Sequence, residues 1–280
     1  MKKALFFFIC TLLVSTAFSQ RTVFGGNWQI NTVGVNLGLN VDIHPNMSMD
    51  WMRAHTKLSE VVRYDNGYTN RSISGSVGGG VFGGQIGLNR TSSDYTGFDN
   101  TSELILSANV IAGREALISF HNTDPETNFK STTSTMFCLV DNEFQLGAEY
   151  RKMKKKGIFN LYAGLGVSAA STFACEMWIF KNRSFNYQQD PEYIVDDYSE
   201  LRSRYYQESF DTYAGNCSMY LRAYTSAGVG MVIANHLELS MDLRLGGGAE
   251  FIYNSNVSSS FFNFSTMTGL KWRIPQNNPR

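Results

Sequence analysis

The fold is decided by residues 264–274, which read Phe264-Ser-Thr-Met-Thr-Gly-Leu-Lys-Trp-Arg-Ile274. From Leu270 onward every second residue is apolar, and Lys271 and Arg273 alternate with them. Successive side chains of a β-strand point to opposite faces, so this strand has one apolar face and one charged face. Such a strand can lie with one face against lipid and the other against a polar interior.

The chain opens with the features of a secretion signal. Two lysines precede a short apolar run over residues 4–14, and residues 17–19 place small side chains at the two positions that a signal peptidase reads. We therefore predict a signal peptide over residues 1–19, cleaved before Gln20, and one domain over residues 20–280. The apolar run is shorter than the roughly 20 residues that a transmembrane helix needs, and no later run approaches that length.

Composition fits a protein made of many strands. The chain has 25 glycines and 14% aromatic residues but only 5 prolines. Its mean hydropathy of −0.20 suits a barrel, in which only half of each strand faces lipid, and equally a soluble secreted protein. The formal net charge of zero provides no clustered basic surface, so no nucleic-acid partner is expected.

Alternation of apolar and polar residues recurs along the chain with a period of two. It is unbroken over residues 33–43. At three further places, two alternating segments flank a short turn and have their apolar residues on the same face, which predicts three hairpins. The three turns are placed at residues 112–114, 153–156 and 234–236. With weaker strands over residues 47–62 and 72–90, the pattern predicts an all-β, antiparallel transmembrane β-barrel of about 10 strands, with eight as the alternative.

The two faces of these strands differ in charge. The outward rows contain no Asp, Glu, Lys or Arg, although 17% of the chain is charged. An Arg or Lys that faces lipid at mid-membrane costs roughly 2–4 kcal/mol. The interior of a barrel of this size is nearly filled by side chains, so we expect the inward charges to form a paired, hydrogen-bonded plug. The predicted lumen charges are Glu149, Arg151, Arg222, Glu238, Asp242, Arg244, Lys271 and Arg273.

The direction of the strands places a long loop outside the cell. Bacterial barrels keep both termini and the short turns in the periplasm, so the segment 171–216 falls on the outer side. Within it, Asp190-Pro191-Glu192 has the cap, first-position proline and first-turn acid of a helix start, which predicts a short helix. Cys175 and Cys217 lie at the two ends of this loop. In an exported protein that position predicts a disulfide across the loop base, with two free thiols as the alternative.

The signal peptide, the hairpins and the segment Gly269-Leu270-Lys271-Trp272-Arg273-Ile274 resemble the small bacterial outer-membrane β-barrel proteins. The segment is similar to the terminal signal that the outer-membrane insertion machinery reads, with Gly269, Trp272 and Ile274 at the matching positions. It departs from that signal at Ile274, where an aromatic is more usual, and in the tail over residues 275–280. The resemblance implies a place in the bacterial outer membrane, with outer-membrane lipid around the chain and the insertion machinery as its partner during assembly.

For function, the sequence favours a non-enzymatic barrel that acts as a structural, surface-binding or envelope-assembly component. Aromatic residues of the 171–216 loop could contact an envelope protein, since aromatics are enriched at interfaces. No catalytic, metal or cofactor residue is predicted, because HExxH, CxxC and GxSxG are absent. The alternatives are a narrow passive channel and a membrane-embedded hydrolase built from separate strands. A soluble secreted β-sandwich is the competing fold.

Overall fold

The structure is a computed structural model of the chain. It describes residues 28–45, 47–62, 70–73, 75–90, 101–123, 130–186, 206–234 and 236–274. The predicted signal peptide, the helix predicted to start at Asp190 and the tail after Ile274 lie outside the described residues.

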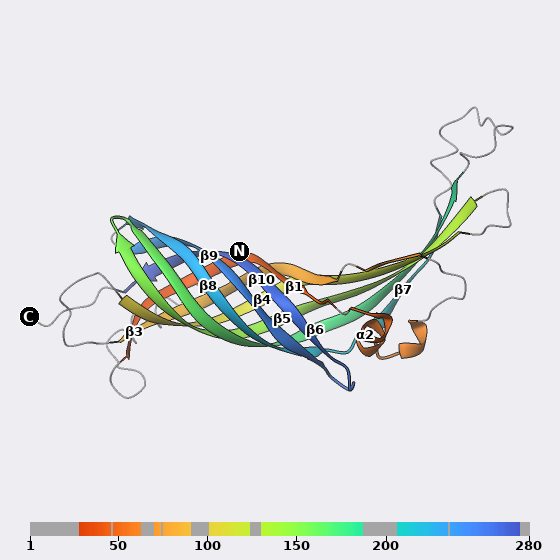
Figure 1. Cartoon of the computed structure of the whole chain (residues 1–280), viewed down its shortest axis with the longest axis horizontal. Helices are drawn as coiled ribbons and strands as arrows, with labels where there is room; N and C mark the ends of the chain where they lie inside the picture. The colour runs from red at the N-terminus through yellow and green to blue at the C-terminus, as the bar shows by residue number, and fades with distance from the viewer. Residues whose placement is uncertain are drawn as a thin grey trace, which may run out of the picture.

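Eight long antiparallel strands form a closed barrel (Figure 1). The ring closes where the first strand pairs with the last, with Val33 opposite Trp272 and Val41 opposite Phe264. Closure leaves no unpaired strand edge within the wall, as a lipid environment requires. The order around the ring is β1 (Trp28–Ile43), β3 (Ser76–Arg90), β4 (Thr101–Thr123), β5 (Lys130–Lys156), β6 (Phe159–Asn186), β8 (Ser218–Ala234), β9 (Leu237–Ile252) and β10 (Ser258–Arg273). The predicted barrel is confirmed, and the closed ring has the eight strands of the alternative.

Short turns and both chain ends of the barrel lie together at one end. The β5–β6 turn is made by Gly157 and Ile158, where Gly157 has a φ of 62°, and β8 passes to β9 between Ala234 and Leu237. Both hairpins are present as predicted, but residues 153–156, predicted as a turn, belong to β5 and the turn follows them. Following the usual orientation of bacterial barrels, this end is termed the periplasmic end and the opposite end the outer mouth.

Three neighbouring strands continue well beyond the outer mouth (Figure 1). β4, β5 and β6 contain 23, 27 and 28 residues, whereas β9 and β10 contain 16 each. Beyond the ring, β2 (Asn70–Ile73) pairs with β4, and β7 (Tyr206–Ala214) pairs with β6. This projection, in the order β2-β4-β5-β6-β7, is termed the outer sheet. The segment 171–216 was predicted as a loop, but residues 171–186 and 206–214 are strand instead.

The first predicted hairpin is wrong, because residues 112–114 lie inside β4 and not in a turn. The register between β4 and β5 shifts between Ile111 and Arg114, and Gly113 has a φ of 64°. Such a β-bulge inserts an extra residue and reverses which side chains face inward. Ile118 and Phe120, expected on the lipid side, are therefore buried inside the outer sheet.

A second bulge lies at the same level on β6. The register between β5 and β6 shifts between Val140 and Asn142, and Ala174 has a φ of 52°. Beyond this point Met177 and Ile179 are buried on the inner side of the sheet. The two bulges together give the outer sheet an apolar inner face above a polar lumen.

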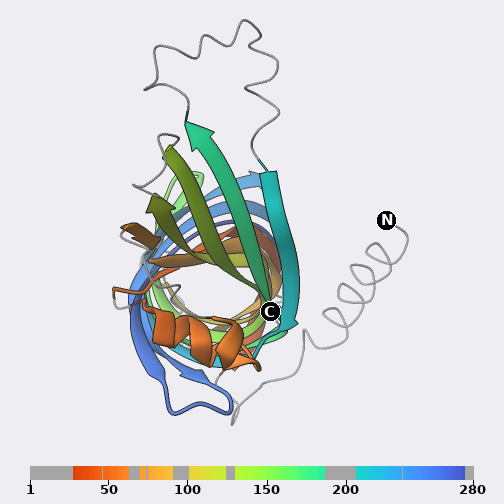
Figure 2. The same ribbon diagram turned by 90° about the vertical axis from the view of Figure 1, so that its right-hand side faces the viewer.

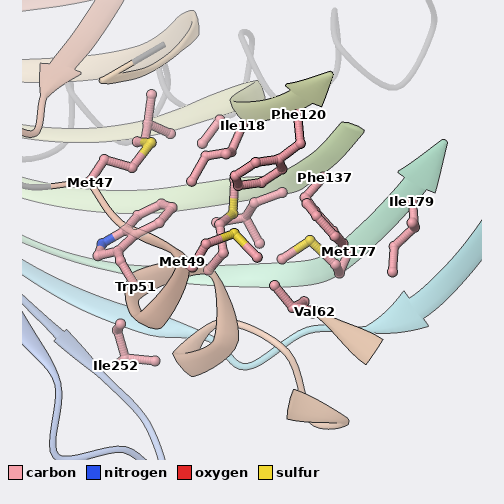
Figure 3. Close-up of a cluster of buried hydrophobic side chains, with 14 residues drawn as sticks. Met47, Met49, Trp51, Val62, Ile118, Phe120, Phe137, Met177, Ile179 and Ile252 are labelled. Carbon is pink, nitrogen blue, oxygen red and sulfur yellow. The ribbon is translucent and has the colours of Figure 1, made fainter. Parts of the chain in front are cut away.

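That inner face is covered by a helix. The strand predicted over residues 47–62 is wrong: the segment forms α2 (Met49–Ala54) and the 3-10 turn η1 (Ser59–Val61). Ser48 caps α2 by accepting a hydrogen bond from the backbone N of Trp51 at 3.2 Å. In the view along the barrel, α2 lies along one edge of the outer mouth (Figure 2). It packs in a buried apolar cluster (Figure 3) of Met47, Met49, Trp51, Met52, Val62, Val77, Ala116, Ile118, Phe120, Phe137, Leu139, Met177, Ile179 and Ile252.

The outside of the ring carries an apolar belt. On β10, exposed apolar residues run from Phe262 to Trp272. Ten steps of about 3.3 Å give about 33 Å along the strand, or about 23 Å along the barrel axis for a strand tilted ~45°. This matches the apolar band of outer-membrane barrels, about 25 Å tall. The described residues place no second protein layer over the belt, so the β-sandwich alternative does not hold.

No helix in the described part of the chain is long and apolar enough to cross a bilayer.

Candidate functional site

The eight lumen charges predicted from the sequence all lie on inward positions of the barrel strands. Seven are buried, and Arg273 is half-buried at the periplasmic end. They join further residues in three groups of ion pairs, at the outer mouth, in the middle and at the periplasmic end.

The outer group surrounds Arg222 of β8. Its guanidinium donates to Asp42 of β1 (Nη2–Oδ2 2.6 Å) and to Glu143 of β5 (Nη1–Oε1 2.7 Å). Arg114 of β4 contacts the same Glu143 (Nη1–Oε2 2.7 Å). Both guanidinium groups lie over the Tyr220 ring, with Cζ 4.5 Å and 4.8 Å from its centroid. Charge pairing and cation–π contacts therefore join four strands across the lumen.

The middle group joins β5 to β9, which are not neighbours in the ring. Glu149 of β5 contacts Arg151 and lies 3.0 Å from Arg244 of β9 (Oε2–Nη2). Arg151 also reaches Asp242 of β9 (Nη2–Oδ2 3.2 Å) and lies over the Tyr162 ring, 4.5 Å from its centroid. Two ion pairs, Glu149–Arg244 and Arg151–Asp242, therefore join β5 to β9.

The periplasmic group is built on Glu238 of β9. Arg273 donates to it at 2.5 Å and Asn160 at 2.6 Å, and the Lys271 ammonium lies 3.7 Å away. Buried charges are tolerated in a protein when they are paired, and every charge named in the three groups has an ion-pair partner. Nε and Nη2 of Arg244 and Nε of Arg114 form no hydrogen bond with the described residues.

Two amide side chains face the same lumen without a protein partner. Both polar atoms of the Asn36 amide on β1 and of the Gln85 amide on β3 are buried, and no described residue bonds to them. Buried polar groups of this kind are usually satisfied by ordered water. We therefore expect water on the β1–β3 side of the lumen, beside the ion-pair groups.

Glu250 of β9 attaches the segment of residues 47–62, which contains α2 and is termed the cap, to the barrel. Its carboxylate accepts hydrogen bonds from Trp51 Nε1 of α2 (2.8 Å), the Tyr220 hydroxyl (2.5 Å) and the Ser259 hydroxyl (2.8 Å). His55, which follows α2, places Nε2 2.8 Å from the same carboxylate. Because Tyr220 also contacts both guanidinium groups of the outer group, the cap and the lumen charges form one connected network.

The mouth brings together a serine, a histidine and a carboxylate, which bears on the hydrolase alternative. Ser218 Oγ lies 3.2 Å from His55 Nε2, the same nitrogen that faces Glu250. The other nitrogen, Nδ1, faces the backbone carbonyl of Trp51 at 2.8 Å. In a Ser-His-acid catalytic triad the serine and the acid occupy opposite nitrogens of the ring. All three side chains are also buried, so the arrangement is that of a structural hydrogen-bond cluster.

Cys175 and Cys217 meet where the outer sheet, the cap and the barrel join. Their sulfur atoms lie 3.1 Å apart, compared with about 2.05 Å in a disulfide. Next to the pair, the backbone N of Asn216 donates to the His55 carbonyl at 2.8 Å, and that of Tyr253 to the Cys217 carbonyl at 2.9 Å. The structure has two adjacent thiols, and the disulfide stays a prediction.

The three residues of the predicted insertion signal occupy different environments. Gly269 of β10 faces inward, where a Cβ would lie 2.8 Å from Asn36 Oδ1 and 2.9 Å from Ser240 Oγ, so close packing alone favours glycine there. Trp272 is exposed at the edge of the apolar belt. Ile274 follows the end of β10 and is buried, with its backbone N bonded to the Asn31 carbonyl at 2.8 Å. The outward apolar row therefore ends at Trp272, and recognition by the insertion machinery stays a prediction.

Sequence reasoning missed several residues of the network, among them Arg114, Tyr220, Glu250 and His55. Arg114 was assigned to a turn, although the preceding Gly113 inside a strand pattern is a signal for a bulge. His55 lies after a helix in a segment that was read as a strand. In the described ranges, no group of three or more His, Cys, Asp or Glu side chains is arranged to hold a metal ion.

No protein-family model and no curated protein sequence matches the chain. Among solved structures, it is similar to the outer membrane protein OprG from Pseudomonas aeruginosa, with 8% identity and a TM-score of 0.34 over 88% of this chain and 97% of that one. It is also similar to Neisserial surface protein A (9% identity, TM-score 0.28, 87% and 97% covered) and to Ail, the attachment invasion locus protein of Yersinia pestis (8%, 0.28, 87% and 99%). These values are too low to carry an argument.

The assignment instead follows from the chain's own geometry. A closed antiparallel ring with an even number of strands, an uncharged apolar belt and a polar interior is the form in which strands cross a membrane. The chain has the fold of a membrane-spanning β-barrel.

Proposed function

We propose that this chain is a non-enzymatic, non-conducting barrel whose outer sheet binds a partner at the cell surface or within an envelope assembly. The observation that carries the proposal is a sheet that projects beyond the outer mouth, with α2 packed against its inner face. Ion pairs cross the lumen at two levels, in the outer and middle groups, and the periplasmic group joins the neighbouring strands β9 and β10. A molecule that approaches the outer end meets the sheet and the cap before it meets the lumen.

The outer sheet offers an aromatic surface for such a partner. On its outer side, Phe180 of β6 lies opposite Phe210 of β7, with ring centroids 4.8 Å apart. Trp178 lies 6.0 Å from Phe210, and the Phe210 side chain is 47% exposed. Exposed aromatic clusters of this kind are common in the anchoring residues of protein interfaces.

Conductance in planar bilayers tests the closed lumen. We expect the purified chain to insert without producing conductance steps, because α2 and the three ion-pair groups lie along the path. A porin in the same bilayer serves as the positive control. Discrete openings would instead support the passive channel, with water beside Asn36 and Gln85 as its path.

Co-purification in mild detergent tests the binding surface. We expect a bound envelope protein with the natural chain and its loss from the double variant Phe180→Ser, Phe210→Ser. The matched control is Phe251→Ser, since Phe251 is similarly exposed at the outer end of β9 but lies away from the outer sheet. Equal recovery from both variants would exclude the aromatic cluster as the binding surface.

A further inference from the structure

The β5–β6 hairpin carries a column of lysines on its lipid-facing side at the periplasmic end. Lys152, Lys154 and Lys156 alternate along β5 and are all exposed. They continue the outward row that includes Tyr150, with about 6.6 Å between successive members. Within the described ranges, none of the three forms an ion pair.

The neighbouring row on β6 is apolar. Ala163 lies opposite Lys152, Leu161 opposite Lys154 and Phe159 opposite Lys156. Each ammonium group therefore lies beside an apolar side chain. Such a surface fits the boundary of a bilayer, where lysine stems cover apolar groups while their charged ends reach the phosphate layer.

A furrow begins at the membrane side of this column. It has a volume of about 560 Å³ and crosses the outer wall from β4 to β9. The outward side chains that line it include Leu104, Tyr150, Leu165, Val167, Ala223 and Leu245. A second furrow of about 650 Å³ also includes Val167 and Ala223, which extends the depression toward the outer mouth. Tyr150 thus lies at the point where an apolar furrow meets an unpaired basic column.

We propose that this surface binds one anionic phospholipid of the inner leaflet, with its phosphate at Lys152 and Lys154 and an acyl chain in the furrow. The charges are complementary, and each lysine near an anionic lipid surface strengthens association several-fold. The site is confined to one side of the barrel. On the opposite side, the periplasmic edge of the belt is formed by uncharged residues such as Leu239, Leu270 and Trp272.

Native mass spectrometry of the detergent-purified chain tests the site, with phosphatidylglycerol and phosphatidylcholine as probes. We expect retained phosphatidylglycerol with the natural chain and a roughly 30-fold loss in the double variant Lys152→Gln, Lys154→Gln. Lys152→Arg, Lys154→Arg should retain the lipid. The charge-matched control Lys57→Gln, Lys181→Gln removes two exposed lysines toward the outer end and should also retain it.

The furrow is tested separately by Ala223→Phe, which places a ring where the acyl chain would lie. It should reduce lipid retention, whereas Ala108→Phe, on an exposed wall position outside these furrows, should not. Heat-dependent gel mobility shows that each variant has folded. Equal retention of the two lipids by the natural chain, or undiminished phosphatidylglycerol in the double glutamine variant, would overturn the proposal.

Discussion

Arg222 holds Asp42 through both of its carboxylate oxygens, with Nη2–Oδ2 at 2.6 Å and Nε–Oδ1 at 3.3 Å. The two residues are 180 positions apart, on β8 and β1, and these strands are not neighbours in the ring. The contact therefore crosses the lumen, because β9 and β10 lie between the two strands in the ring. The charges that fill the lumen also hold its walls in place.

Removing this arginine should destabilise the barrel strongly. Arg222→Met leaves Asp42 and Glu143 buried with one cation fewer, and breaking a buried pair in this way costs about 3–5 kcal/mol. We expect a lower urea midpoint, measured by tryptophan fluorescence in detergent. Asp50→Asn is the control, because Asp50 pairs with Arg53 at the surface, where such pairs contribute about 0–1 kcal/mol. Equal midpoints for the two variants would contradict a structural role for the lumen pairs.

A charge on the apolar belt should impair membrane insertion. Met241 is 60% exposed near the middle of β9, and Met241→Arg at mid-membrane should cost about 2–4 kcal/mol. The folded fraction after refolding into vesicles measures the effect. Thr212→Arg, exposed on β7 in the outer sheet, should refold like the natural chain. If both variants refolded equally well, the belt would not be in contact with lipid.

The sequence predicts the parts of this fold in which alternation is regular. Inward and outward residues alternate without interruption within the belt on β1, β8, β9 and β10. Their inward charges could therefore be assigned from the sequence alone. The alternation no longer gives the correct face beyond the β-bulges at Gly113 and Ala174. A single extra residue in the strand turns every later side chain to the opposite face.

The cap could not be predicted for a different reason. α2 has only 6 residues, too few for a helical period to stand out against a poor strand pattern. Its position depends on contacts with distant residues, such as the hydrogen bond from Trp51 to Glu250. The pairing of the lumen charges depends in the same way on ring closure, which brings β5 opposite β9.

Loss of the Trp51 side chain should release the cap while leaving the ring closed. Trp51→Ala removes the Nε1 hydrogen bond to Glu250 and a buried ring, a change that typically costs about 3–5 kcal/mol. Limited proteolysis should then cut within residues 47–62, while heat-dependent gel mobility still reports a folded barrel. Leu58→Ala, at a side chain that is 46% exposed, should leave this segment resistant. Simultaneous loss of cap and barrel would show that the two fold as one unit.

Oxidation should join Cys175 to Cys217, because their sulfur atoms already lie 3.1 Å apart. The bond would form as the two thiols transfer two electrons and two protons to a disulfide of a periplasmic oxidant through thiol–disulfide exchange. On the chain-entropy model, closing a separation of 42 residues stabilises the fold by about 4 kcal/mol. Non-reducing peptide mapping should find this pair linked, and Cys175→Ser should lower the urea midpoint only under oxidising conditions. Cys138→Ser should leave the link intact, whereas free thiols at both positions in protein purified from the envelope would contradict the prediction.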